Sequence, residues 1–148
     1  IMDIDHFKTI NDSYGHAVGD EILKEFSARV QDRLRSFDLV SRYGGEEFVV
    51  ILPDVTDNVA HVVAERLRRG IAKEPFKCSA PEGEITVTVS VGGTIVKKQT
   101  EHSIEDILKR ADKALYEAKE NGRNICYFDD IGRLDPELYK PTPRIFIE

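Results

Sequence analysis

The sequence predicts an α/β fold in which helices pack against one mixed central sheet. Segments with helical apolar spacing alternate along the chain with short apolar or alternating segments typical of strands. A Gly-Gly pair between two of these strand-like segments indicates a tight antiparallel hairpin. The chain has 148 residues, of which 41% are hydrophobic. That is enough for one core, so we expect a single sheet and not two domains.

The elements expected in the first half are a short strand, a helix and the hairpin. "IMDI" is an apolar strand at the start of the chain. From about residue 19 to residue 34, apolar residues recur at helical spacing, with Asp20 and Glu21 in the first turn, where the helix dipole favours acids. The hairpin strands cover 39–43 and 46–52, and the glycines between them can adopt the positive φ that a tight turn requires.

Two helices and two strands are expected in the second half. A helix over 57–72 begins at a cap, Asp57, and its expected buried positions are Val59, Val63, Leu67 and Ile71. "EITVTVSVGG" alternates apolar and hydroxyl residues, as a strand with one buried face does. Ser103 caps a last helix, which ends at Gly122 and carries the apolar stripe Ile104, Ile107, Leu108, Ala111, Leu115 and Ala118. "NICYF" is the final strand.

Composition excludes several classes of protein. The formal net charge of -6 argues against a nucleic-acid partner, because duplex binding needs a basic surface. The longest apolar run, "FVVIL", is too short to cross a bilayer, and the first residues of the given sequence lack the pattern expected of a secretory leader. We therefore expect a cytoplasmic domain, although its opening at Ile1 indicates a fragment whose full-length protein could be membrane-anchored. Cys78 and Cys126 lack metal-ligand spacing and are expected to be reduced thiols.

Several carboxylates are expected to meet at one edge of the sheet. Side chains alternate along a strand, so Asp3 and Asp5 point one way while Ile4 points into the core. If the hairpin pairs beside the first strand, Glu46 or Glu47 approaches Asp3. Carboxylates this close need a cation, and an all-oxygen site that also receives phosphates suits Mg²⁺. A solvated hairpin tip is the alternative, and the spacing alone favours neither.

Three motifs together resemble the GGDEF-domain diguanylate cyclases. They are "DIDHFKTINDSYGHAVGD", "RYGGEEF" with the Glu variant of the name-giving motif, and "ADKALYEAKENGRN", in the family's order from about residue 1 to residue 127. The resemblance implies a palm-like, ferredoxin-like nucleotidyl cyclase domain over 1–128, followed by an extension or linker over 129–148. It implies condensation of two GTP into cyclic di-GMP with release of two pyrophosphates. The reaction would be metal-assisted attack of a 3′-hydroxyl on an α-phosphate across a homodimer.

The resemblance also implies roles for individual residues of the active site. Asp3, Glu46 and the backbone carbonyl of Ile4 would bind two Mg²⁺ ions, with Mn²⁺ as an alternative. Glu47 would be a second ligand, a base for the 3′-hydroxyl, or a residue that holds the turn. The GTP-binding set is Phe7, Lys8, Asn11, Asp20, Gly44, Gly45, Lys119 and Arg123. Within it, Asn11 and Asp20 would read guanine, the two glycines would lie against the triphosphate, and the three cations would contact phosphates.

The pattern of residues alone favours ordinary structural readings of the same positions. Asn11 would be a turn residue and Asp20 a helix-start acid, while Lys119 and Arg123 would complete a helix C-terminus. Lys8 would be a solvated lysine. His16 falls within the family's "YGHAVGD" pattern, where the resemblance implies a structural, hydrogen-bonding role and not a catalytic one.

A second site is suggested by "RSFD", which is similar to the family's RxxD inhibitory motif for cyclic di-GMP. The resemblance implies that Arg35 and Asp38, with a further contact from Arg66, bind the product and hold two subunits apart. Arginine suits phosphate and guanine contacts, and a carboxylate can accept from guanine N–H groups. The alternative is a cation at a helix end beside a solvated acid.

Two classes of function remain. The acids Asp3, Glu46 and Glu47 are intact, which favours an active cyclase over a cyclic di-GMP receptor that retains only the RxxD site. A single-strand-binding domain fits poorly, because the aromatic residues fall in core patterns without interleaved basic residues. The family's "DxLTxLxNR"-like stretch ahead of the first strand is absent. A sensor or dimerisation domain is expected upstream.

Overall fold

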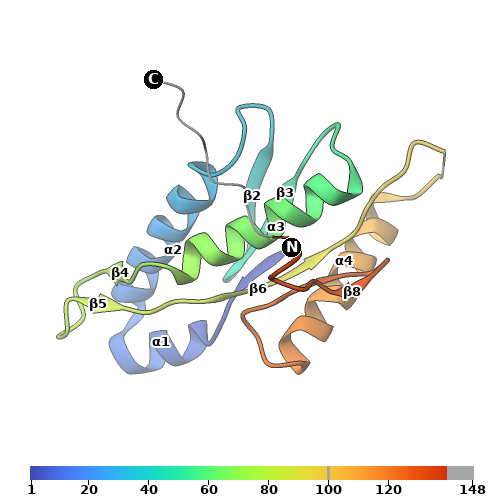
Figure 1. Cartoon of the computed structure of the whole chain (residues 1–148). Coiled ribbons are helices and arrows are strands. Elements are labelled where there is room, and N and C mark those ends of the chain that lie inside the picture. The colour runs from blue at the N-terminus through green and yellow to red at the C-terminus, as the bar shows by residue number, and fades with distance from the viewer. Residues whose placement is uncertain (100, 140–148) are drawn as a thin grey trace, which may run out of the picture.

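A six-stranded mixed sheet with the strand order β2-β3-β1-β6-β7-β8 forms the centre of the protein (Figure 1). The computed structural model describes residues 1–99 and 101–139. Strands β6 and β7 pair in parallel, and the other neighbours pair antiparallel. The strands of this sheet are β1 (Met2–Ile4), β2 (Leu39–Gly44), β3 (Glu47–Ile51), β6 (Val89–Gly93), β7 (Cys126–Phe128) and β8 (Gly132–Arg133). The predicted fold class is therefore confirmed.

Four helices and a small ribbon complete the described fold. The helices are α1 (Phe7–Tyr14), α2 (His16–Gln31), α3 (Asp57–Ala72) and α4 (Ile104–Glu120). Strands β4 (Phe76–Lys77) and β5 (Glu84–Ile85) form the separate two-stranded ribbon. None of the helices in the described ranges combines the length and apolar character needed to cross a membrane.

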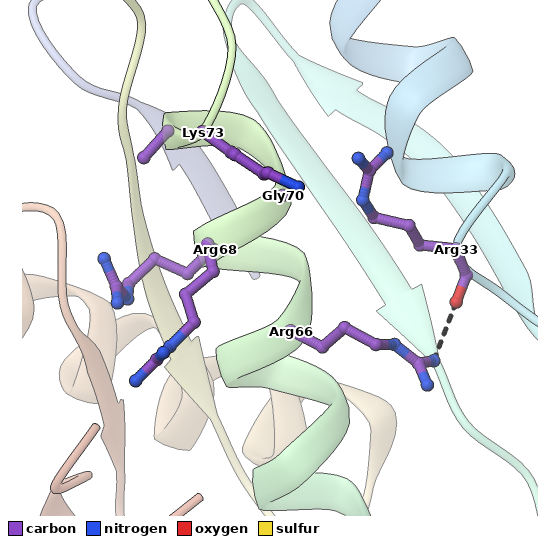
Figure 2. Close-up of a pocket in the computed structure, with 7 residues that line it drawn as sticks. Arg33, Arg66, Arg68, Gly70 and Lys73 are labelled. Carbon is purple, nitrogen blue, oxygen red and sulfur yellow. Dashed lines mark hydrogen bonds between the residues drawn. The ribbon is translucent and has the colours of Figure 1, made fainter. Parts of the chain in front are cut away.

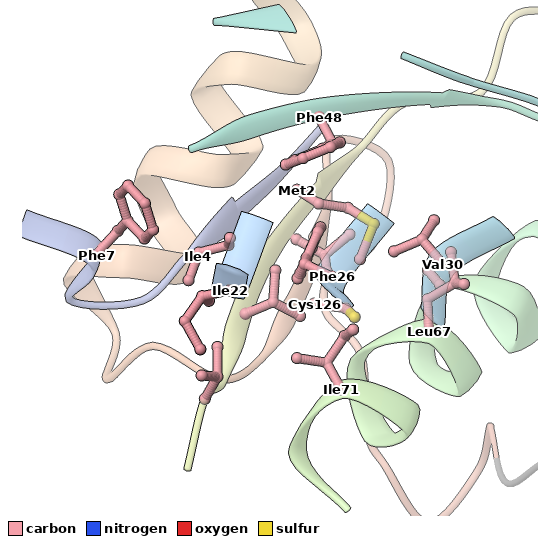
Figure 3. Close-up of a cluster of buried hydrophobic side chains, with 14 of the residues drawn as sticks. Met2, Ile4, Phe7, Ile22, Phe26, Val30, Phe48, Leu67, Ile71 and Cys126 are labelled. Carbon is pink, nitrogen blue, oxygen red and sulfur yellow. The ribbon is translucent and has the colours of Figure 1, made fainter. Parts of the chain in front are cut away.

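The alternation of side chains in β1 gives the sheet two different faces. Met2 and Ile4 join the larger core, together with apolar side chains of α2 and α3. Figure 3 shows this cluster, in which Phe26 of α2 and Ile71 of α3 are fully buried. On the other face, Ile1 packs with residues of α4. Asp3 therefore lies on the face that α4 covers.

Gly92 allows α4 to pack closely on β6. A Cβ at Gly92 would lie 2.2 Å from the backbone nitrogen of Leu115 and 2.4 Å from the carbonyl oxygen of Ala111. Any side chain here would push the helix away from the sheet, since neither neighbour is a flexible side-chain end. This close contact sets the height of α4 above Asp3.

The helices differ from the sequence-based expectation in four places. Helix α1 was not predicted, because "NDSYG" contains the residues that also favour turns. Helix α2 begins and ends three residues earlier than expected. Thr56, and not Asp57, caps α3 by accepting from the N–H of Val59. In the same helix, the Val59 side chain is exposed and not buried as predicted. In α4, Ser103 is the cap as predicted, but Ile104 is 77% exposed and does not join the apolar stripe.

Two strand predictions also needed correction. The segment 84–93 is not one strand, because Glu84 and Ile85 pair in the ribbon while Val89 to Gly93 enter the main sheet. The prediction that only one face of this segment is buried is also wrong, because Ser90 on the other face is fully buried and donates to Asp5. The last strand begins at Cys126 and not at Asn124, because Arg123 and Asn124 have positive φ.

Residues 129–139 continue the fold beyond the family motifs. Strand β8 pairs with β7, and the Leu134 side chain is only 1% exposed within the main core. The carbonyl of Pro136 accepts from Arg69, and the ring of Tyr139 packs against His61. Of the predicted extension or linker, this part is a packed extension, and residues 140–148 lie outside the described residues.

Candidate active site at the acidic edge

Pairing of β1 with β3 brings the predicted acids together. Asp3 lies directly opposite Glu47 in the antiparallel register, and the carbonyl of Glu46 accepts from the N–H of Ile4 at 3.3 Å. Directly opposed residues share a face of the sheet, so Asp3 and Glu47 both point toward α4. The hairpin is thus beside the first strand, as the sequence analysis required.

Lys119 at the end of α4 completes this edge. Its Nζ donates to Oδ2 of Asp3 at 2.8 Å, across 116 positions of sequence. Asp3 is 5% exposed, whereas the Lys119 side chain is 31% exposed. One cation therefore already faces the buried carboxylate, with its other side open to solvent.

The electrostatics of Asp3 indicate a shortage of positive charge. Burial, with a smaller contribution from the charges of Glu46 and Glu47, raises the pKa of Asp3 to about 6 against the opposing hydrogen bond and charge of Lys119. A carboxylate keeps a pKa this high only where its environment compensates its charge incompletely. Additional cationic charge at this edge would be favourable.

The donor chemistry of the edge fits a hard divalent cation. Carboxylate and carbonyl oxygens are the ligands that Mg²⁺ prefers. In the described ranges, however, no three acidic, histidine or cysteine side chains converge into a ready metal cluster. The Asp3 carboxylate already accepts a hydrogen bond from Lys119. A metal ion would therefore have to share this carboxylate with Lys119 or displace the amine.

The predicted guanine-reading residues lie on adjoining helices, α1 and α2. A Cβ at Gly19 would lie 1.9 Å from Oδ1 of Asn11 and 3.3 Å from the ring of Phe7, so the glycine permits close packing of the two helices. Oδ1 of Asn11 is buried and has no hydrogen-bond partner among the described residues. Such an acceptor costs about 1–3 kcal/mol, which a ligand N–H could recover. Asp20, next to Gly19, is exposed.

Other predicted GTP-binding residues differ in their accessibility. Phe7 is 8% exposed and belongs to the main core, so its ring supports α1 more than it lines an open site. Lys8 is exposed. At the hairpin tip, no described atom lies within 4 Å of a Cβ built on Gly44 or Gly45, and Gly45 has a φ of +54°. This open backbone matches the surface that a phosphate chain would need.

Arg123 lies in the turn after α4. Its backbone is left-handed, with φ 60°, and its side chain is exposed. Within the part of the chain that the structure describes, this side chain makes no hydrogen bond or ion pair. Lys119 and Arg123 thus leave the same end of α4, one bound to Asp3 and one free.

The residues of the predicted inhibitory site also come together. Arg35 Nη2 donates to Oδ1 of Asp38 at 2.7 Å, and its guanidinium stacks over the ring of Phe37. The hydrogen bond from Arg35 lowers the pKa of Asp38, and the charge of Arg66 contributes in the same direction. Arg66 itself donates to the backbone carbonyl of Arg33 at 2.7 Å.

A pocket of about 540 Å³ lies along α3 beside this cluster (Figure 2). Its lining residues are mostly cationic: Arg33, Arg66, Arg68, Arg69, Gly70, Ala72 and Lys73. The residues of the acidic edge do not line it: Asp3, Glu46, Glu47 and Lys119. Figure 2 shows Arg33 and Arg66 on one side of the helix and Arg68 on the other, so these cations do not converge on one point.

Sequence reasoning missed one group of buried polar residues near the acidic edge. Asp5 points to the same face as Asp3, as predicted, but its carboxylate is bound by Thr88, Ser90 and the backbone N–H of Asn124. Asp5 is therefore not available as a metal ligand. The alternation of hydroxyl residues in "TVTVSV" was the available signal for these contacts.

Comparisons with known proteins identify the family of this chain. Residues 1–125 match the family model described as diguanylate cyclase, GGDEF domain. The chain is 44% identical over 124 residues to the response regulator PleD of Caulobacter vibrioides, which covers 84% of this chain and 27% of PleD. Among solved structures, the GGDEF domain of DgcB from Caulobacter crescentus, in complex with c-di-GMP, has a TM-score of 0.80 at 32% identity. That match covers 87% of this chain and 75% of the DgcB chain.

A second solved structure shares the motif variant. The active GGEEF domain of a diguanylate cyclase from Vibrio cholerae has a TM-score of 0.76 at 36% identity, covering 86% of this chain and 78% of that one. The mixed sheet with flanking helices and its likeness to these solved GGDEF domains define a nucleotidyl-cyclase type of α/β domain. The chain belongs to the GGDEF-domain family of diguanylate cyclases. It spans about a quarter of the length of PleD.

Proposed function

We propose that this domain is a diguanylate cyclase that condenses two GTP molecules into cyclic di-GMP and two pyrophosphates. The observation that carries the proposal is the acidic edge, where the β1–β3 register sets Asp3 against Glu47 and Lys119 reaches across from α4. A buried and a half-buried carboxylate beside a lysine suit a metal-bound triphosphate. The likeness to PleD and to the cyclic di-GMP complex of DgcB supports the choice of substrate and product.

Asp3, Glu46 and the carbonyl of Ile4 would hold the metal. Cyclases of this family are generally metal-dependent, and two Mg²⁺ ions per site are our expectation, with Mn²⁺ as the alternative. When bound, the cations would acidify the attacking 3′-hydroxyl and neutralise charge on the α-phosphate. Glu47, opposite Asp3, has three candidate roles: a further ligand, a base for the hydroxyl, or a residue that holds the turn.

The remaining site residues would bind GTP. The buried Oδ1 of Asn11 would accept from a guanine N–H, and Asp20 would accept from the other donors, which adenine does not present. The open tip at Gly44 and Gly45 would receive the phosphates. The cations for the triphosphate would be Lys8, Lys119 and Arg123.

Chemistry requires two subunits, since each GTP attacks the other. We propose a homodimer in which each subunit holds one GTP and the two sites face one another. Product would inhibit by binding at Arg35 and Asp38, with Arg66 as a further contact, and by holding the subunits apart. The support is the compact cluster that these three residues form.

The test is formation of cyclic di-GMP from GTP and Mg²⁺ by this chain fused to a dimeric coiled coil. We expect product in the parent fusion and none above background in Glu46→Ala. The coiled coil keeps the two half-sites together, so a negative result cannot be ascribed to dissociation. Added product should inhibit the parent, and Arg35→Ala should relieve that inhibition without loss of turnover. Unchanged inhibition in Arg35→Ala would rule out this inhibitory site.

A receptor without synthesis is the second candidate, favoured only by the Arg35–Asp38 cluster. It predicts no product, together with binding of cyclic di-GMP that Arg35→Ala abolishes. Binding measured by titration calorimetry beside the cyclase assay separates the two functions.

A further inference from the structure

The turn that carries Arg123 has a demanding backbone. Three successive residues have positive φ: 115° at Gly122, 60° at Arg123 and 48° at Asn124. For residues other than glycine this conformation costs about 1–2 kcal/mol each. Surrounding contacts must therefore hold the turn in place.

Two buried charged groups, Asp5 and Arg68, form hydrogen bonds with Asn124. Oδ2 of Asp5 accepts from the backbone N–H of Asn124 at 3.0 Å. Nη1 of Arg68 donates to Oδ1 of Asn124 at 2.7 Å and to its carbonyl oxygen at 3.2 Å. The strained turn is thus tied to β1 by Asp5 and to α3 by Arg68.

Both groups are themselves fixed. Hydroxyls of Thr88 and Ser90 donate to the Asp5 carboxylate at 2.7 and 2.6 Å. Arg68 binds the fully buried Glu65 through two nitrogens. Burial alone would raise the pKa of Glu65, but hydrogen bonds from Arg68 and Arg69 hold that pKa below its usual value. The Arg68–Glu65 pair is therefore charged, and its side chains have little freedom to move.

We propose that Asp5, Arg68 and Asn124 form a brace that holds Arg123 in position for the triphosphate of GTP. The three residues would act through the backbone of the turn and not on the substrate itself, so they are positioning residues. The inference rests on the proposed function, which assigns Arg123 to the phosphates. A long, exposed arginine loses much conformational freedom on binding, and a fixed backbone origin reduces that loss.

Arg69 supplies a matched control for Arg68. Both arginines bind Glu65, but Arg69 continues to the carbonyl of Pro136 and does not reach the turn. Arg68→Met and Arg69→Met each leave Glu65 with one arginine. A difference between these variants therefore reports the contact with Asn124.

The experiment is a double-mutant cycle that measures the affinity for 3′-deoxy-GTP in the presence of Mg²⁺. This nucleotide lacks the attacking hydroxyl and cannot react. The full chain carries Arg68→Met or Arg69→Met, with and without Arg123→Ala. We expect Arg68→Met to weaken binding about tenfold when Arg123 is present, and to change it little in the Arg123→Ala background. Arg69→Met should change little in either background.

Two results with the methionine variants would overturn the brace. One is an equal effect of Arg68→Met with and without Arg123, and the other is an equal effect of the two methionine variants. If Arg123→Ala alone leaves affinity unchanged, Arg123 does not bind the triphosphate, and both that assignment and the brace fall. If no variant or parent binds the nucleotide, the proposed function itself falls, and the brace with it.

A second variant and readout cover the case in which Arg68→Met does not fold. Asn124→Gly removes the side-chain acceptor while retaining the N–H that bonds to Asp5, and it should show the same coupling to Arg123. Amide hydrogen exchange at residue 124 should be slow in the parent and faster in the Asn124→Gly and Arg68→Met variants. Unchanged exchange would contradict a brace.

Discussion

At Asp3, burial and charge act against each other. The side chain is almost fully buried beside two other acids, and one lysine compensates it from a part-exposed position. Lys119 thus stabilises the carboxylate in the absence of other cations and stands where we expect phosphates. The same arrangement would make the site responsive to a metal–nucleotide complex, because the complex brings both a cation for Asp3 and an anion for Lys119.

Stability should depend on the protonation of Asp3. Its pKa rises from 3.8 to about 6 on folding, so the native state holds the proton more tightly than the unfolded chain. This contribution is present at pH 4 and is lost as pH rises through 6. The Asp3→Asn variant has no such titration. Without divalent ions, its free energy of unfolding relative to that of the parent should therefore increase by about 1–3 kcal/mol when the pH is raised from 4.5 to 7.5. Urea unfolding at both pH values measures this, and an equal difference at the two would contradict it.

Local signals in the sequence were sufficient for some elements and not for others. Apolar spacing located α3 and α4, the Ser103 cap located the start of α4, and the glycine pair located the hairpin. Helix α1 was missed because its residues also favour turns, and only burial of Phe7 and Ile10 by distant parts of the chain selects the helix. The bonds from Thr88 and Ser90 to Asp5 join segments more than 80 positions apart, which no local pattern encodes.

Alanine at Gly92 and alanine at Gly44 should affect different properties, stability in the first case and nucleotide binding in the second. Gly92→Ala places a Cβ against the backbone of α4, so we expect a loss of about 1–3 kcal/mol in the free energy of unfolding. Gly44→Ala meets open space and should unfold like the parent, but its methyl group should weaken GTP binding at the hairpin tip. Urea unfolding and nucleotide titration of both variants test the pair. A stable Gly92→Ala protein would show that α4 is not fixed by this contact.

At the scale of the whole molecule, helix α3 links the two proposed sites. The central strand β1 carries Asp3, while α3 carries Arg66 toward the inhibitory cluster and Arg68 toward the turn of Arg123. The sequence motifs predicted a set of residues for each site, and that assignment stays a prediction. They did not predict that one helix contacts both, because that depends on how α3 lies across the sheet.

The extension after β7 should be part of the folding unit. Leu134 is 1% exposed in the main core, whereas Leu138, four residues on, is 75% exposed. Leu134→Ala should lower the free energy of unfolding by about 2–5 kcal/mol, because it leaves a cavity beneath β8, and Leu138→Ala should leave it nearly unchanged. Urea denaturation of the two variants measures the difference. Equal stability would mean that the domain ends at the family motifs, and that residues 129–139 only rest on its surface.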